Sequence, residues 1–284
     1  MSSSTETTEQ SHLTLGFPAK SPADLAAMQA ELPKMVPGLY KAGDAMGSMH
    51  YGRFTAYRNT VYLLADVDGD AETALAALPR YFGAVLDPLL AHVADAPPTP
   101  VASNTRAFAD WAMRHNIKPA LGYANYGGVP VGRVKSLAAQ AGLELDVATA
   151  QQLPMLLMMP MTSREGRAEL DAGLNAARED LYKGADGIGT AHFAHFVEMP
   201  DTMLGFFTIY DGPFEKYAQD FAEHMGPAFD LLFAYTKNPP PTPTAKNVAP
   251  FTLWVREHFL EQLAFYSAYP GLLGSDIRAL LAEA

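Results

Sequence analysis

The sequence predicts an α+β protein made of two copies of one unit, each with the element order β-α-β-β-α-β. Three observations lead to this prediction. Matching residues recur at a nearly constant spacing along the 284-residue chain. Each half alternates short apolar runs, typical of strands, with segments of helical periodicity. The hydrophobic content of 49% is enough for each half to bury a core of its own.

The internal repeat includes both tryptophans of the chain, Trp111 and Trp254. At an offset of 142, the matches pair Leu39, Tyr40, Lys41, Asp44, Gly47, His50 and Phe54 with Leu181, Tyr182, Lys183, Asp186, Gly189, His192 and Phe196. At an offset of 143, they pair Gly83, Asp87, Asn104, Phe108, Trp111, His115, Tyr123 and Tyr126 with Gly226, Asp230, Asn247, Phe251, Trp254, His258, Tyr266 and Tyr269. The change of one residue predicts a β-bulge or a longer turn between residues 60 and 68.

The first elements of the first copy are a strand and an interrupted helix. Residues 13–18 form a short apolar run and are predicted as a strand. Ser21 is a good N-cap and Pro22 suits the first helical position, so a helix should begin there. Pro33 removes a backbone donor and should kink or interrupt this helix.

A hairpin and a second helix follow in the first copy. Residues 49–56 and 60–67 are predicted as two strands joined by a short turn. Residues 70–82 are predicted as a helix, and the apolar run at residues 85–93 as the fourth strand of the unit. These elements complete the order β-α-β-β-α-β.

An additional helix-strand-helix segment follows a proline-rich break at residues 97–100. Asn104 is predicted to cap a helix, residues 121–126 to form an extra strand, and residues 131–141 a closing helix.

The second copy predicts the same elements in the same order. They fall at residues 155–161, 163–183, 190–198, 203–210, 213–225, 229–236, 247–259, 262–269 and 275–282. We therefore expect a first repeat at 13–145 and a second at 153–284. Residues 1–12 are expected to be a disordered tail, because the start of the chain is polar and resembles no signal peptide.

The order β-α-β-β-α-β is the ferredoxin-like plan. Two tandem ferredoxin-like units, each with an extra helix-strand-helix, resemble the dimeric α/β-barrel superfamily in a single-chain form. This superfamily includes dye-decolourising peroxidases, chlorite dismutases, aldoxime dehydratases and small cofactor-free monooxygenases. The resemblance implies two antiparallel sheets that face each other around a pocket, as a pseudo-twofold α/β barrel.

The resemblance also implies a function, namely an oxidoreductase, peroxidase- or monooxygenase-like, acting on a small apolar or aromatic molecule in the barrel pocket. Haem is a candidate cofactor. In haem members of the superfamily a helix histidine holds the iron, which points to His224 as a candidate haem ligand. The sequence Gly184-Ala185-Asp186-Gly187 is similar to the G-x-x-D-G motif of the peroxidases but is one residue shorter.

Composition limits the partners and cofactors. The net charge of −11 disfavours nucleic acid and anionic membrane surfaces, both of which attract basic proteins. The chain has no cysteine, so a metal or haem iron would need histidine, carboxylate, tyrosine or methionine ligands. We expect a soluble, cytoplasmic protein, and a homodimer is compatible with the sequence.

Comparison of the two copies selects the candidate catalytic residues. Positions shared by both copies serve the fold, whereas a site present in only one half needs positions that differ. Arg53 and His195 occupy equivalent positions and differ, so they are candidates. His50 and His192 are shared and are candidates if they point into the barrel, with a structural bond to the backbone or to the Asp44 or Asp186 loop as the alternative.

Two further expectations remain open from the sequence. His192 and His195 are three residues apart, so a regular strand would place them on opposite faces and prevent them from sharing a metal ion.

The sequence also contains no phosphate-binding or nucleophile motif. A non-catalytic small-molecule-binding or accessory protein of the same fold is therefore the alternative function.

Overall fold

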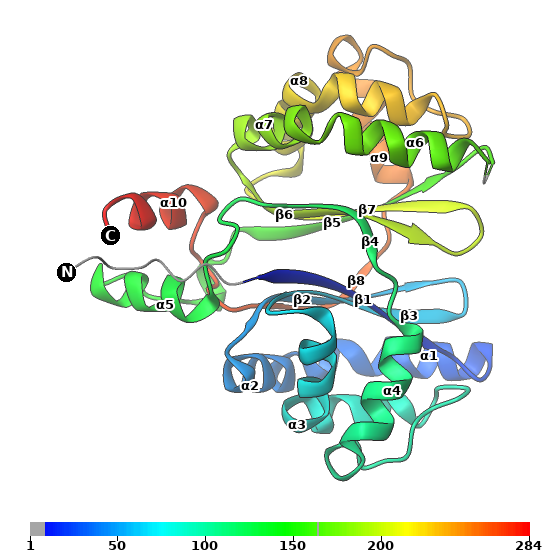
Figure 1. The fold of residues 1–284 in the computed structure, drawn as a ribbon, viewed down its shortest axis with the longest axis vertical. Helices are drawn as coiled ribbons and strands as arrows, with labels where there is room; N and C mark the ends of the chain where they lie inside the picture. Colours follow the sequence, from blue (N-terminus) through cyan, green and yellow to red (C-terminus); the bar gives the residue numbers. More distant parts are fainter. Residues whose placement is uncertain (1–8, 164) are drawn as a thin grey trace.

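Two four-stranded antiparallel sheets lie together at the centre of the molecule, with helices on their outer faces (Figure 1). The computed structural model describes residues 9–163 and 165–284. Helices α1 to α4 cover one sheet and α6 to α9 cover the other, while α5 and α10 lie side by side at one end. No helix in the described ranges is both long enough and apolar enough to span a bilayer.

Each sheet takes three strands from one half of the chain and one strand from the other half. The first has the order β1-β3-β2-β8 and consists of β1 (Gln10–Pro18), β2 (Met49–Tyr57), β3 (Thr60–Asp68) and β8 (Gln262–Ser267). The second has the order β4-β6-β7-β5 and consists of β4 (Pro119–Ala124), β5 (Gln152–Pro160), β6 (Ala191–Met199) and β7 (Met203–Asp211). The halves thus exchange their last strands.

The helices follow the same order in both halves. Those of the first half are α1 (Pro22–Glu31), α2 (Val36–Met46), α3 (Ala71–Leu90), α4 (Thr105–His115) and α5 (Val131–Gln140). Those of the second are α6 (Glu165–Ala176), α7 (Arg178–Ile188), α8 (Phe214–Phe233), α9 (Val248–Glu257) and α10 (Gly274–Ala282). Ser21 caps α1 as predicted, and Pro33 lies in a short 3-10 helix that separates α1 from α2.

The prediction of a fourth strand at residues 85–93, and of its counterpart at 229–236, is wrong. Helix α3 continues to Leu90 and α8 continues to Phe233. The buried side chains Leu78, Phe82, Leu86 and Leu89 recur every three or four residues, so the apolar face of the helix extends through the segment. The fourth strand of each sheet is instead the strand predicted as extra, β8 in the first sheet and β4 in the second.

The change of the repeat offset from 142 to 143 residues corresponds to a longer hairpin turn in the second half. Two residues, Arg58 and Asn59, connect β2 to β3, whereas residues 200–202 connect β6 to β7. Asp201 and Thr202 both adopt positive φ in that longer turn. The inserted residue therefore lies in the hairpin turn, at the position equivalent to the turn before β3, and not between residues 60 and 68 as predicted.

Two seams join the edges of the sheets. An isolated bridge links Leu15 of β1 to Asn116, just before β4, and an equivalent bridge links Leu157 of β5 to Phe259, just before β8. An apolar cluster with members such as Leu64 and Met158 fills part of the space between the sheets. Strand β1 begins at Gln10, earlier than predicted, which includes His12 in the sheet; residues 1–8 of the predicted tail lie outside the described part of the chain.

Candidate functional site

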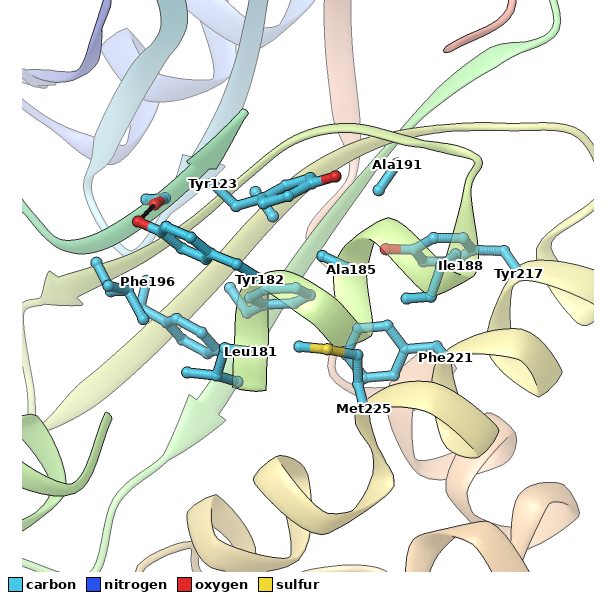
Figure 2. Close-up of a pocket in the computed structure, with 14 residues that line it drawn as sticks. Tyr123, Leu181, Tyr182, Ala185, Ile188, Ala191, Phe196, Tyr217, Phe221 and Met225 are labelled. Carbon is cyan, nitrogen blue, oxygen red and sulfur yellow. Dashed lines mark hydrogen bonds between the residues drawn. The ribbon is translucent and has the colours of Figure 1, made fainter. Parts of the chain in front are cut away.

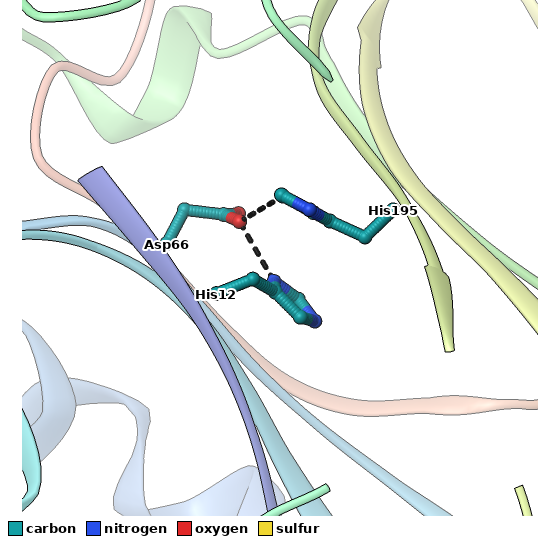
Figure 3. A group of neighbouring side chains, drawn as sticks. All are labelled: His12, Asp66 and His195. Carbon is teal, nitrogen blue, oxygen red and sulfur yellow. Dashed lines mark hydrogen bonds and ion pairs between the residues drawn. The ribbon is translucent and has the colours of Figure 1, made fainter. Parts of the chain in front are cut away.

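A buried cluster of charged and polar side chains lies between the two sheets (Figure 3). Asp66 of β3 is at its centre. Its Oδ1 atom is 2.8 Å from Nδ1 of His12 on β1 and 2.8 Å from Nε2 of His195 on β6, in the opposite sheet. Its Oδ2 atom accepts a hydrogen bond of 2.8 Å from Nη1 of Arg53 on β2. The rings of His12 and His195 stack with their centroids 4.0 Å apart.

The charges in this cluster fix the protonation of Asp66 and His12. Burial raises the pKa of Asp66, but the Arg53 guanidinium and the two histidines outweigh that effect and hold the pKa well below its usual range. Burial and the neighbouring His195 lower the pKa of His12 to about 3, against the opposing effect of Asp66. At neutral pH, Asp66 is therefore a carboxylate, and the neutral His12 donates to it from Nδ1 and keeps a lone pair on Nε2.

Several buried polar atoms around the cluster have no hydrogen-bond partner among the described residues. They are His12 Nε2, Thr14 Oγ1, Arg53 Nε, Arg53 Nη2 and both ring nitrogens of His195. The 2.8 Å contact between His195 Nε2 and Asp66 is thus close enough for an ion pair but lacks the alignment of a hydrogen bond. Unpaired buried groups are costly, so their concentration here indicates a site for a ligand or ordered water.

A cleft of about 810 Å³ reaches this cluster from the seam between β1 and β4. Its walls include His12, His195, Phe193, Tyr123, Tyr182 and Asn116. His195 remains 7% exposed there. The site is therefore buried but accessible to a small molecule.

The contrast between Gly122 and Phe265 explains why the cleft lies at this seam. Gly122 pairs with His195 in the second sheet, and at the equivalent place in the first sheet Phe265 pairs with Arg53. A Cβ atom on Gly122 would lie 2.7 Å from Nδ1 of His195, so only glycine leaves room for the imidazole. Phe265 therefore places a bulky side chain on β8 at the position where β4 has the glycine.

His50 and His192 lie in a second polar network, which is symmetric. Nε2 of each hydrogen-bonds the aspartate at the end of the hairpin, His50 with Asp68 (2.8 Å) and His192 with Asp211 (2.7 Å). Asp68 and Asp211 also accept from the first backbone N–H of α5 and of α10, respectively. The partners are these aspartates, not the Asp44 and Asp186 loops that the structural alternative named.

Tyrosine hydroxyls complete this network. His50 Nδ1 hydrogen-bonds Tyr269, whereas His192 Nδ1 contacts both Tyr126 (3.0 Å) and Tyr51 (2.9 Å). Strict alternation fails at His192, because a register shift interrupts β6 between Ala191 and Phe193 and its ring contacts Tyr51 of the other sheet. The shared histidines thus tie the two sheets together.

His224 lies apart from both networks. It is exposed on α8 and packs against α7, where a Cβ on Gly187 would approach its Nδ1 to 2.7 Å. A Cβ on Gly184 would meet the His224 carbonyl oxygen at 2.8 Å. The glycines of the Gly184-Ala185-Asp186-Gly187 sequence therefore let α7 and α8 approach closely, and His224 does not line the cleft.

A separate apolar pocket lies between the second sheet and helices α7 and α8 (Figure 2). Tyr123 and Tyr182 line both this pocket and the cleft. The Tyr182 hydroxyl donates to the carbonyl of Gly122 (2.6 Å), and the Tyr123 hydroxyl donates to Asp186 (2.7 Å). These bonds hold the two rings at the cleft wall.

Sequence reasoning selected Arg53 and His195, which the structure brings together around Asp66, but it missed His12 and Asp66. The same comparison of copies would have found both. His12 corresponds to Pro154 at an offset of 142, and Asp66 to Ile209 at an offset of 143. Each is a polar residue within an apolar strand of one half only.

Comparisons with known proteins give remote similarities of fold. No protein-family model matches the sequence, and no curated protein matches it. A "putative monooxygenase" from Lactobacillus acidophilus is similar with a TM-score of 0.38 and 6% identity, over 93% of this chain and 99% of that chain. An "anthrone oxidase-like protein" gives a TM-score of 0.31 and 10% identity, over 94% and 97%.

A "putative monooxygenase" from Fusobacterium nucleatum gives a TM-score of 0.35 and 8% identity, over 94% of this chain and 97% of that chain. At such TM-scores and identities, the similarity assigns neither an activity nor a substrate to this chain.

Proposed function

We propose that this protein is an oxidoreductase that acts on a small apolar or aromatic molecule bound in the β1–β4 cleft. The observation that carries the proposal is the cluster of His12, Asp66, His195 and Arg53 at the inner end of the cleft, with several polar atoms unpaired. A perturbed, buried titratable group next to a cleft is the usual physical sign of a reaction centre.

The walls of the cleft indicate the class of substrate. Phe193, Tyr123 and Tyr182 offer aromatic surface, and Asn116, Asn125 and Lys118 line the same cleft with polar groups. A planar aromatic molecule with a hydroxyl or carbonyl group would satisfy both sets of contacts. The hydroxylated members of this class give up electrons readily, and dioxygen is the co-substrate that we propose to accept them.

The repeat explains how one such site could arise. We propose that residues 13–145 and 153–284 are copies of one ancestral unit, arranged as a pseudo-twofold barrel with exchanged last strands. The shared His50 and His192 networks serve both halves alike. The positions that differ then build a single reaction centre at one seam, with Arg53 and His195 as members.

Haem would require a different ligand from the one that the superfamily resemblance implies. A haem at His224 would lie on the outer surface of the helix layer. An interior haem in the cleft would use His12 or His195, the two histidines that line it. A Soret band in protein expressed with a haem supply would support haem in the proposal, and colourless protein that takes up no added hemin would remove it.

Turnover of electron-rich aromatics tests the proposed function. The full chain should consume dioxygen when mixed with a panel of phenols and hydroxylated polycyclic aromatics, and mass spectrometry should detect oxidised product. His195→Gln should lower the rate about 100-fold or more, because this residue faces the reacting group. His92→Gln, which alters a surface His–Asp pair outside the site, should leave the rate unchanged.

The alternative is a non-catalytic small-molecule-binding or accessory protein of the same fold. It is favoured by the low pKa of His12, about 3, because so weak a base removes protons poorly. Aromatic ligands that bind in the cleft and are recovered unchanged, in air and with haem or metal supplied, would establish this alternative and refute the oxidoreductase proposal.

A further inference from the structure

We infer that His12, Asp66 and His195 form a binding site for one divalent transition-metal ion. The inference extends the site of the proposed function. It requires no turnover, because binding of an ion can be measured directly.

The positions of the donor atoms carry the inference. His12, Asp66 and His195 each offer one ligand atom, and these three atoms lie within 4.8 Å of one another. An ion bound at Nδ1 of His12 would move the proton of that nitrogen to Nε2. Asp66 Oδ1 is 2.8 Å from each of the two imidazole nitrogens. Metal–ligand bonds of about 2.1 Å at right angles place neighbouring donors about 3.0 Å apart. Two histidines and one carboxylate are also the donor set of many non-haem iron sites.

The lack of an aligned hydrogen bond at His195 is a second observation. Its ring is buried, and neither nitrogen has a hydrogen-bond partner in the described part of the chain, although Nε2 is 2.8 Å from a carboxylate oxygen. An ion placed among the three donors would give Nε2 a ligand bond in place of this poorly aligned contact. It would also link β1 and β3 of one sheet to β6 of the other.

The surroundings of the three donors suit a metal site. Arg53 binds Oδ2 of Asp66 and leaves Oδ1 free to face the histidines, as outer-shell partners of metal-bound carboxylates do. Gly122 leaves room for the His195 ring, because a Cβ atom there would lie 2.7 Å from Nδ1. The cleft, lined by His12 and His195, supplies an entry path and space for further ligands such as water or substrate.

The balance of charge predicts which ions bind. Asp66 is the single carboxylate among the three donors, and Arg53 already compensates its charge. Hard ions such as Mg²⁺ and Ca²⁺ prefer several oxygen ligands and should not bind. Zn²⁺, Co²⁺ and Fe²⁺ accept imidazole nitrogen and should bind.

The experiment is isothermal titration calorimetry of the chelator-treated full chain with Co²⁺ and Zn²⁺, with Mg²⁺ as the negative ion. We expect one Co²⁺ per chain and a visible Co²⁺ absorption band. Asp66→Asn and His195→Gln should each weaken binding at least 10-fold and alter the band. The matched control is His92→Gln, which changes a His–Asp pair of similar length (2.9 Å) on the surface and should not affect binding.

His195→Gln is the decisive variant if Asp66→Asn fails to fold, because His195 makes no hydrogen bond that the fold would lose. A protein that binds no Co²⁺ or Zn²⁺, or whose affinity is the same in folded His195→Gln, overturns the inference. A protein that oxidises substrate but binds neither Co²⁺ nor Zn²⁺ overturns the metal site and leaves the proposed function. Metal binding without turnover of any substrate overturns the proposed function and leaves the metal site.

Discussion

Arg53 is the residue whose loss should cost the most stability in the polar cluster. Its side chain and that of Asp66 are both fully buried, and they form an ion pair of 2.8 Å. Arg53→Met would leave the carboxylate buried without its cation. We expect the free energy of unfolding to fall by about 3–5 kcal/mol, measured by urea denaturation at neutral pH.

An exposed arginine provides the control for this prediction. Arg58 forms an ion pair with Asp201 in which both side chains are largely exposed to solvent. Arg58→Met should therefore leave the urea midpoint nearly unchanged. Equal effects of the two substitutions would mean that Arg53 does not neutralise a buried charge.

At this scale, the sequence predicted half of the cluster. Arg53 and His195 were found because they differ between equivalent positions. His12 was missed because the apolar run that predicts the strand begins only at Leu13, and Asp66 because the surrounding strand is otherwise apolar. Contact between His195 and Asp66 depends on how the two sheets pack against each other. A local sequence pattern cannot predict that packing.

At the scale of elements, local periodicity predicted most helices and both hairpins but not the ends of α3 and α8. Residues 85–93 contain a run of apolar residues that resembles a strand, yet their buried positions continue the helical face of residues 71–84. Short apolar runs fit both structures, and only packing against the sheet decides between them. The same ambiguity misplaced the fourth strand in both halves.

A network of tyrosine hydroxyls connects β2 and β6 with the segments that follow β4 and β8, and it should make stability sensitive to alkaline pH. Tyr126 and Tyr269 follow β4 and β8, and their hydroxyls are 3.1 Å apart, near Tyr51 of β2 and His192 of β6. Burial above all, together with the neighbouring phenols and acids, raises the pKa of all three tyrosines well above the usual value. The folded protein therefore keeps their protons at a pH where the unfolded chain releases them.

The sign of the effect follows from this difference in bound protons. Above about pH 10 the unfolded state binds fewer protons than the folded state, so stability falls as pH rises, by about 1.4 kcal/mol per pH unit for each tyrosine. Tyr126→Phe should make this decline shallower, although it weakens the protein near neutral pH by about 1–2 kcal/mol. Urea denaturation at several pH values measures both effects. An identical decline in the variant would contradict the assignment.

At the scale of the whole molecule, the exchange of β4 and β8 makes the halves interdependent. Local sequence patterns could not predict it, because a strand carries the same alternation whichever sheet it joins. The exchange pairs Gly122 with His195 and Arg53 with Phe265, and so determines which seam is open. The reaction centre of the proposed function thus depends on both halves, with three residues from one and His195 from the other.

This arrangement predicts that the two halves associate when they are made as separate chains. Residues 1–145 and 146–284 should co-purify and elute with the mass of the intact protein, because each supplies the last strand of the other's sheet. Either half alone would leave a sheet edge unpaired and its own last strand without a partner, so it should aggregate or self-associate. Removing residues 262–284 from the second chain should weaken the association, since β2 then lacks β8 and, of the two exchanged strand pairings, only that of β4 with β6 still crosses between the chains. A first half that is monomeric and unfolds cooperatively on its own would contradict the exchange.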